Sequence, residues 1–243
     1  MLRPKRRSAM VASASLFAAL YAVLGAIPVS RLLLGSGFLT ASNIITPLSG
    51  MLFGPIVGGG AALIGDLIDV YAGQLSTGAT ALSVIAADLA VVATAGLAFS
   101  KWRRLALFIP LAALVIYTVD PISVLFVGLV PFTWLHILSF VTLAVTLVLE
   151  GRGIIDRISP IFVSAVTFAS LMCGHLVGTI VGQDLLVRVY GVYTPAAWDS
   201  LMANFVFAAY PIERVFFSVA GSIVAIPVLR SISGARRASP TAS

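Results

Sequence analysis

Long apolar stretches, separated by short polar ones, follow one another along most of the chain. A helix needs roughly 20 apolar residues to cross the hydrocarbon core of a bilayer, and the pattern contains neither a soluble domain nor a heptad repeat. We therefore expect an all-α integral membrane protein, a polytopic bundle of six to eight helices in a single membrane domain over residues 9–230. The clearest candidate helices cover residues 9–27, 80–99, 105–127, 134–149, 161–181 and 203–230.

One further stretch, PLSGMLFGPIVGGGAALIGDLID over residues 47–69, fits two topologies. As one helix kinked at Pro55, which membrane helices tolerate, it gives seven spans. As two helices, over 40–53 and 55–71, it gives eight. Gly54 suits the end of a helix because glycine adopts left-handed backbone angles without cost, and proline suits the first turn of the next helix.

The basic residues distinguish these two topologies. With eight spans, twelve of them fall on one side of the membrane and only Arg31 and Arg188 on the other; with seven, the better division is nine against five. Cytoplasmic loops carry an excess of Lys and Arg, so we favour eight spans with both termini in the cytoplasm. The four clusters lie in residues 3–7, 101–104, 152–157 and 230–237.

The composition agrees with a membrane protein. The chain is 60% hydrophobic and 10% charged, whereas soluble domains are nearer a quarter charged. Its net charge of +6 sits in short clusters between apolar runs, so we expect the lipid bilayer and no nucleic acid as partner. The first apolar stretch is longer than that of a usual signal peptide, which favours a retained helix after a basic cytoplasmic segment over residues 1–8. Residues 231–243 are expected to form a disordered cytoplasmic tail.

Ionisable residues within the spans concentrate at one depth. With eight spans and a rise of 1.5 Å per residue, five helices place such residues in the outer half or near the middle of the membrane. A charge near the bilayer centre costs about 3 kcal/mol or more, so these groups usually pair or line a cavity. We expect a polar chamber open to the outside, although ion pairing with Arg214 accounts for the same charges. The candidate binding residues are Arg31, Asp66, Asp69, Asp88, His175, Asn204, Tyr210, Glu213 and Arg214.

The charges in this zone also indicate a class of ligand. Asp66, Asp69, Asp88 and Glu213 outnumber Arg214, which favours a cationic or amine-bearing solute. The chain contains no Walker A, HExxH, CxxC or GxSxG sequence, so we expect no ATP hydrolysis, catalytic residue, metal or cofactor in this chain. An intramembrane enzyme is the minor hypothesis.

Small residues form a second pattern in the first helix. Ala14, Ala18, Ala22 and Ala26 recur every four residues and so lie on one face. Such a face lets another helix approach closely. Packing within the protein and docking of a partner protein are the two interpretations of this face.

The sequence SASLFAALYAVLGAIPV, followed by PLSGMLFGPIVGGGAALIGDLID, resembles the substrate-binding S components of energy-coupling factor (ECF) transporters. The matches are an Ala-rich first helix, a turn of the form G-x-L-F-G-P with Gly50, Gly54 and Pro55, and a following Gly65–Asp66 pair. The likeness covers about the first 70 residues well and the last 30 loosely. Members of that family usually have six helices, so a hairpin over 105–149 would be additional here.

The resemblance implies a plasma-membrane protein that captures a vitamin-like micronutrient from outside. It implies a T component and two ATPase subunits as partners that drive inward release, with the Ala-rich face meeting the T component. The loop over 28–42, with Gly35 and Gly37, would suit a lid. From the residues alone, a stand-alone secondary transporter is the alternative, with Asp66, Asp88 and Glu213 as proton or sodium carriers.

Overall fold

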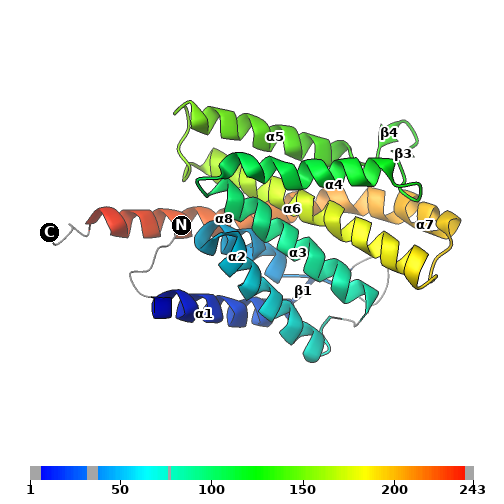
Figure 1. The fold of residues 1–243 in the computed structure, drawn as a ribbon, viewed down its shortest axis with the longest axis horizontal. Helices are drawn as coiled ribbons and strands as arrows, with labels where there is room; N and C mark the ends of the chain where they lie inside the picture. The colour runs from blue at the N-terminus through cyan, green and yellow to red at the C-terminus, as the bar shows by residue number, and fades with distance from the viewer. Residues whose placement is uncertain (1–6, 32–37, 76–77, 239–243) are drawn as a thin grey trace.

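The computed structural model describes residues 7–31, 38–75 and 78–238 of the chain, which form a helical bundle (Figure 1). Two short antiparallel hairpins, β1 (Pro28–Arg31) with β2 (Phe38–Thr40) and β3 (Phe126–Val127) with β4 (Val130–Pro131), lie in its connections. A 3₁₀ turn, η1 (Arg103–Leu107), and two π-helical segments, η2 (Asp184–Val189) and η3 (Met202–Val206), adjoin the helices. The helices are α1 (Arg7–Gly25), α2 (Ser42–Tyr71), α3 (Ala79–Ala98), α4 (Phe108–Val119), α5 (Trp134–Gly151), α6 (Pro160–Gln183), α7 (Pro195–Leu201) and α8 (Phe207–Ala238).

Five helical segments in the described part are long and apolar enough to cross a membrane. This confirms the expected all-α, multi-pass membrane protein. Helix α1 adds a shorter apolar segment, Met10–Gly25. The total of eight spans, and the placement of both termini in the cytoplasm, stay predictions. The five segments are Ser42–Tyr71, Ala79–Ala98, Trp134–Gly151, Pro160–Val189 and Pro195–Ser233.

Helix α2 is interrupted at Gly54, whose backbone angles are φ 80° and ψ 177°. A Cβ built on Gly58 would lie 2.7 Å from the carbonyl oxygen of Ser49. In a straight helix, nine residues would separate these positions by about 13 Å along the axis. The two arms of α2 therefore fold back on each other, as the predicted turn at Gly54–Pro55 requires, and Pro55 begins the second arm without losing a helical hydrogen bond.

Helix α1 packs against both arms of α2. The rings of Phe17 and Phe53 meet edge to face, with centroids 5.6 Å apart. Further along α1, the Tyr21 hydroxyl accepts a hydrogen bond from Thr46 Oγ1 at 3.5 Å. The ring of the same tyrosine lies against Gly65, where a Cβ would come within 2.4 Å of it. Because Thr46 and Gly65 lie on opposite sides of the break, these contacts stabilise the reversal of the chain.

Glycines allow the helices around this turn to approach closely. A Cβ on Gly50 would lie 2.4 Å from a backbone oxygen of α3, and one on Gly96 would lie 2.6 Å from the nitrogen of Pro55. On the other side of α3, a Cβ on Gly174 of α6 would lie 2.8 Å from the carbonyl oxygen of Ala87. Close approach of this kind is typical of membrane helices that meet through small residues.

The helix predicted over 105–127 is wrong in extent, because α4 ends at Val119. The next residue, Asp120, precedes a proline, which disfavours helical backbone. Its carboxylate also accepts a hydrogen bond from the nitrogen of Ile122 at 2.8 Å, which closes a turn. The chain then forms the β3–β4 hairpin before α5 begins.

The last helix also differs from the prediction of 203–230. Helical structure begins at Pro195, because the Thr194 side chain caps α7 by accepting a hydrogen bond from the nitrogen of Ala197 at 3.2 Å. Helix α8 then continues to Ala238, so the prediction of a disordered tail is wrong for residues 231–238, which are helical. Residues 239–243 of the predicted tail lie outside the described part, as do residues 1–6 of the predicted N-terminal segment.

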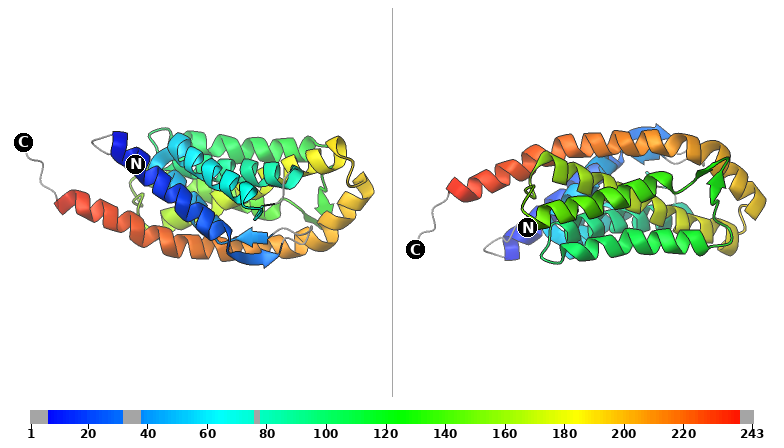
Figure 2. Two further views of the ribbon diagram at one scale, coloured as in Figure 1. Left: turned by 90° about the horizontal axis from the view of Figure 1, so that it is seen from below. Right: turned by 90° about the horizontal axis from the view of Figure 1, so that it is seen from above.

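The two ends of the bundle differ in charge. The start of α1 and the end of α8 lie at one end, whereas β3, β4 and α7 lie at the other (Figure 1). We call the first the basic end and the second the cavity end. Helix α8 runs along the whole length between them (Figure 2). The basic end carries Arg103, Arg104, Arg152, Arg157 and Arg230.

Replacing Gly96 with alanine tests the close packing at the turn. The new methyl group would meet the backbone of Pro55, and overpacking of this kind typically costs about 1–3 kcal/mol. We expect Gly96→Ala to lower the thermal unfolding temperature in detergent. Gly60→Ala is the matched control, because a Cβ there would meet no atom within 4 Å and alanine favours a helix. Equal unfolding temperatures for both variants would contradict this packing.

Candidate functional site

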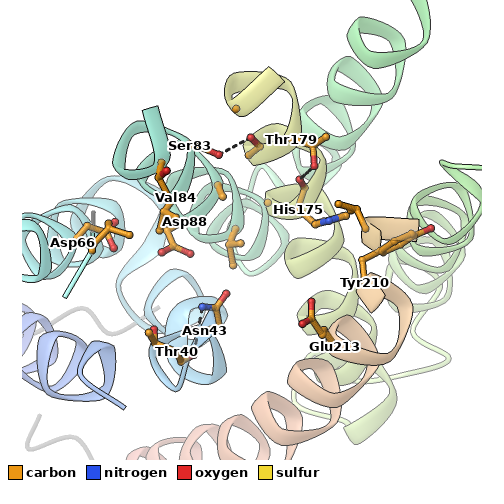
Figure 3. A pocket seen from close by; sticks show the side chains of 18 of the residues that line it. Thr40, Asn43, Asp66, Ser83, Val84, Asp88, His175, Thr179, Tyr210 and Glu213 are labelled. Carbon is orange, nitrogen blue, oxygen red and sulfur yellow. Dashed lines mark hydrogen bonds between the residues drawn. The ribbon is translucent and has the colours of Figure 1, made fainter. Parts of the chain in front are cut away.

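A cavity of about 380 Å³ opens between α2, α3, α6 and α8 toward the cavity end. Its volume lies within the range of small-molecule sites, roughly 300–1,000 Å³. Figure 3 shows Asp66 and Asp88 on one side of it and His175, Tyr210 and Glu213 on the other. Seven of the nine predicted binding residues line the cavity: Asp66, Asp69, Asp88, His175, Tyr210, Glu213 and Arg214.

The acidic side of the cavity is formed by α2 and α3. Asp66 and Asp69 are three residues apart on the second arm of α2, so their side chains share a face, and Asp88 extends from α3. These three residues are only 2%, 6% and 4% exposed. Asp66 Oδ2 and Asp69 Oδ1 have no hydrogen-bond partner within the described part of the chain. Unpartnered buried oxygens of this kind are rare in folded proteins.

Helix α1 contributes two residues that the sequence analysis did not assign to the site. The hydroxyl of Tyr21, which is completely buried, donates a hydrogen bond to Asp88. Gly25 lines the cavity, and a Cβ there would overlap the carboxylate of Asp69. Tyr21 could have been identified from the sequence, because it carries the one hydroxyl in the apolar run LFAALYAVLG. A buried tyrosine usually bonds its O–H to a partner.

Arg214 of α8 is the one cation among the described residues that line the cavity. It is 8% exposed, and its guanidinium interacts favourably with the carboxylates of Glu213 and Asp88. Its Nε has no hydrogen-bond partner within the described residues. The interactions with Glu213 and Asp88 agree with the alternative explanation, ion pairing with Arg214, whereas Asp66 Oδ2 and Asp69 Oδ1 have no such partner among the described residues.

The opposite side of the cavity is aromatic. His175 Nδ1 lies 2.9 Å from Nε2 of His136 on α5. The Tyr210 ring stacks on both imidazoles, with centroids 4.9 Å and 5.4 Å away. The Tyr210 hydroxyl donates to the carbonyl oxygen of Phe132 at 2.8 Å. The histidine pair was not predicted, because its members are 39 residues apart on different helices.

A cover formed by η2, α7 and η3 contributes Leu186, Tyr193, Trp198 and Met202 to the cavity wall. The Trp198 Nε1–H donates to Gln183 Oε1 at 3.1 Å, and the same glutamine donates to Ser123. The Arg188 guanidinium donates to both carboxylate oxygens of Asp120 at 2.7 and 2.9 Å. These bonds fasten the cover to the end of α6 and to the loop after α4.

Two predicted binding residues are not brought to the cavity. Asn204 of η3 is exposed and donates to Ser200 Oγ at 3.1 Å. Arg31 ends β1, and its side chain lies outside the described part of the structure, as do Gly35 and Gly37 of the proposed lid. The loop over 28–42 nevertheless reaches the site, because Thr40 and Ser42 line the cavity, which the sequence analysis did not predict.

The Ala-rich face of α1 is not the free surface that a partner interface requires. Ala18 is 3% exposed and packs with the buried cluster that includes Phe17 and Tyr21. Ala14 and Ala22 are half-buried, and the exposed Ala26 lies beyond the end of α1. Residues spaced by four are each rotated by about 40° around the helix axis relative to the previous one. The predicted row of alanines therefore does not stay on one exposed side of α1. The exposed small residues of α1 include Ala12, Ser15 and Ala19.

Within the described ranges, no group of three His, Cys, Asp or Glu side chains is arranged to hold a metal ion. Carboxylates, imidazoles, one guanidinium and aromatic rings can instead bind an organic solute by charge, hydrogen bonding and stacking.

Comparisons of the chain with models of protein families, with curated proteins and with solved structures find no match. The function of the protein is therefore inferred from the cavity and from the residues that line it.

Proposed function

We propose that this chain is a membrane-embedded binding subunit that captures a small, amine-bearing solute at the cavity end. The observation that carries this proposal is the excess of carboxylates around one cavity. Asp66, Asp69, Asp88 and Glu213 face it, and among the described residues that line the cavity the guanidinium of Arg214 is the one cation. An ammonium group would bind the open oxygens of Asp66 and Asp69 through charge-assisted hydrogen bonds, which are about twice as strong as neutral ones.

The shape of the cavity supports an organic cation over a bare ion. An inorganic cation needs only a few oxygen ligands, whereas this cavity extends from the carboxylates to an aromatic side formed by His175 and Tyr210. A planar group on the solute would stack on these rings, and a cation also binds favourably to an aromatic face. A vitamin-like micronutrient that carries an amine matches both sides.

The distribution of charge supports capture from outside. Basic loops favour the cytoplasm, so the basic end of the bundle is proposed to face inward in the plasma membrane. The cavity end then faces outward. The cover over residues 184–206 must move to let a solute pass, and the bonds made by Arg188 and Trp198 hold it in place in this structure.

We propose the role of an S component in an ECF-type importer, in which a T component and two ATPase subunits supply the energy. The chain contains no ATP-binding motif, so uphill uptake requires partner subunits or an ion gradient. The exposed small residues Ala12, Ser15 and Ala19 of α1 offer a surface that another helix can approach closely. This surface replaces the row of Ala14, Ala18 and Ala22 as the proposed contact with the T component.

One observation favours an ion-coupled secondary transporter as the second candidate. The carboxyl groups of Asp66 and Asp88 lie on different helices and interact with each other, and the Tyr21 hydroxyl bonds Asp88. Neighbouring buried carboxyls of this kind can hold a proton or a sodium ion between them. In that case Asp66 and Asp88 would carry the coupling ion, and no ATPase would be needed.

Purification from the native membrane separates the two candidates. We expect the tagged chain to copurify with a polytopic membrane protein and two ATPase subunits in mild detergent. Uptake of the amine-bearing solute into native vesicles should continue after the ion gradients across the membrane are collapsed, provided that ATP is supplied. Uptake that depends on an ion gradient, with no ATPase attached, would favour the secondary transporter and overturn the ECF proposal.

Asp66→Asn tests the acidic side of the cavity. Asparagine has nearly the same shape but no charge, so we expect benzylamine to bind at least about tenfold more weakly, the loss of one charge-assisted hydrogen bond. The neutral N-benzylacetamide should bind weakly to both proteins. Calorimetry in detergent measures these affinities, and Asp156→Asn, at an exposed position near the basic end, is the matched control. Unchanged benzylamine affinity in a folded Asp66→Asn protein would show that the residue has a structural role instead.

Ala19→Trp tests the proposed partner surface. The bulky side chain at an exposed position of α1 should block close approach of another helix, so copurification of ATPase subunits should fall while benzylamine binding stays the same. Val145→Trp is the control, because this exposed residue lies on α5, on the opposite side of the bundle from α1 (Figure 1). Full copurification with Ala19→Trp, or equal loss in both variants, would contradict docking at this face.

A further inference from the structure

The histidine pair behind the cavity determines what kind of polar atom the aromatic side presents. A hydrogen bond joins His136 Nε2 and His175 Nδ1 at 2.9 Å. In such a bond one nitrogen carries the proton and the other offers its lone pair. Burying a charged imidazole without a partner is costly, so both rings are taken as neutral. Two proton arrangements are then possible, and they differ in whether Nδ1 of His136 carries an N–H or a lone pair.

The arrangement follows from Nδ1 of His136, which is buried and has no hydrogen-bond partner within the described part of the chain. If His175 donated the shared proton, this Nδ1 would carry an N–H with no acceptor, and buried orphan N–H groups are rare. If His136 donates, the same nitrogen holds only a lone pair. His136 is also the third residue of α5, where the helix dipole places partial positive charge. That charge favours a lone pair over another N–H group.

We infer that His136 is a positioning residue, which donates its Nε2–H to His175 and thereby fixes the proton of His175 on its own Nε2. The side chain of His175 lines the cavity, and Nε2 is the ring nitrogen that the histidine pair leaves available. Stacking of Tyr210 on both imidazoles holds the rings in this orientation. The aromatic side of the cavity therefore presents an N–H donor, whereas the opposite side presents carboxylate acceptors.

This arrangement deepens the proposed function, on which it rests for the presence of an amine ligand, by adding a second requirement. The solute has an ammonium group that binds near Asp66 and Asp69, and a planar group with a neutral acceptor, such as a ring nitrogen or carbonyl, that accepts from His175. Glu213 lies on the same side of the cavity (Figure 3), but its carboxylate interacts favourably with Arg214. An amine whose ring lacks an acceptor would leave the His175 N–H unsatisfied.

Nitrogen NMR tests the proton arrangement without any ligand. The chain has only two histidines, so protein labelled with ¹⁵N-histidine in lipid nanodiscs gives four ring-nitrogen signals. We expect both Nε2 atoms to be protonated and both Nδ1 atoms to be unprotonated. His136→Gln leaves one histidine for assignment, and its amide can still donate to His175. A protonated Nδ1 on His175 in the unmodified protein would overturn the inference.

A matched pair of amines tests the consequence for binding. 4-(Aminomethyl)pyridine and benzylamine differ only by a ring nitrogen in place of a C–H group. At a pH where the pyridine is neutral, we expect the pyridine to bind about tenfold tighter, as one buried hydrogen bond predicts. This preference, measured as the ratio of the two affinities in each variant, should disappear in His136→Leu and return in His136→Gln. A preference that survives in His136→Leu would overturn the positioning role.

The two possible failures are distinguishable. Equal affinity of the unmodified protein for both amines would overturn this inference and leave amine capture intact. Binding of neither amine would contradict the proposed function and the ligand class together, whereas the proton arrangement measured by NMR does not depend on that outcome.

Discussion

The reversal of the chain at Gly54 is the constraint on which the rest of the structure depends. Only glycine adopts its backbone angles of φ 80° and ψ 177° without strain. The reversal lets the two arms of α2 pack side by side, with α1 against both. It also carries Asp66 and Asp69 to the end of the bundle opposite the turn. Without it, a straight helix would place the start of α2 and these carboxylates at opposite ends, and Tyr21 would not contact both arms.

The second constraint is the free-energy cost of burying the acidic side chains around the cavity, because such groups usually pair or line a cavity. Carboxyl groups from α2 and α3 converge with that of Glu213 from α8, and Arg214 is the one cation among the described lining residues. Arg214 interacts with Glu213 and Asp88, and Tyr21 bonds Asp88, so the carboxyl oxygens left without a partner in the described residues are Asp66 Oδ2 and Asp69 Oδ1. In the proposed function, the ammonium group of the solute binds these oxygens and supplies the positive charge that the protein does not provide there. By the inference above, the paired imidazoles present an N–H donor on the side of the cavity opposite the carboxylate acceptors. The site would therefore distinguish the two ends of a solute.

Much of this arrangement could be predicted from periodicity and charge, because membrane helices follow simple rules of length and composition. The turn at Gly54 and the convergence of seven polar residues followed from those rules. The pairing of His136 with His175 did not, since contacts between distant helices depend on how each helix is rotated. The same rotation made Ala18 a buried residue. The turn signal at Asp120 and the helix cap at Thr194 were present in the sequence. The helix bounds were predicted from hydrophobicity alone, which does not register such signals.

The most direct measurement is the identity of the small molecule that the protein retains. Protein purified rapidly from its native membrane is denatured, and the released solutes are identified and quantified by mass spectrometry against an empty-vector control. The cavity predicts one enriched organic amine, present at close to one molecule per protein and carrying a planar group with a hydrogen-bond acceptor. Enrichment of an anionic or purely apolar compound at that stoichiometry would contradict the account.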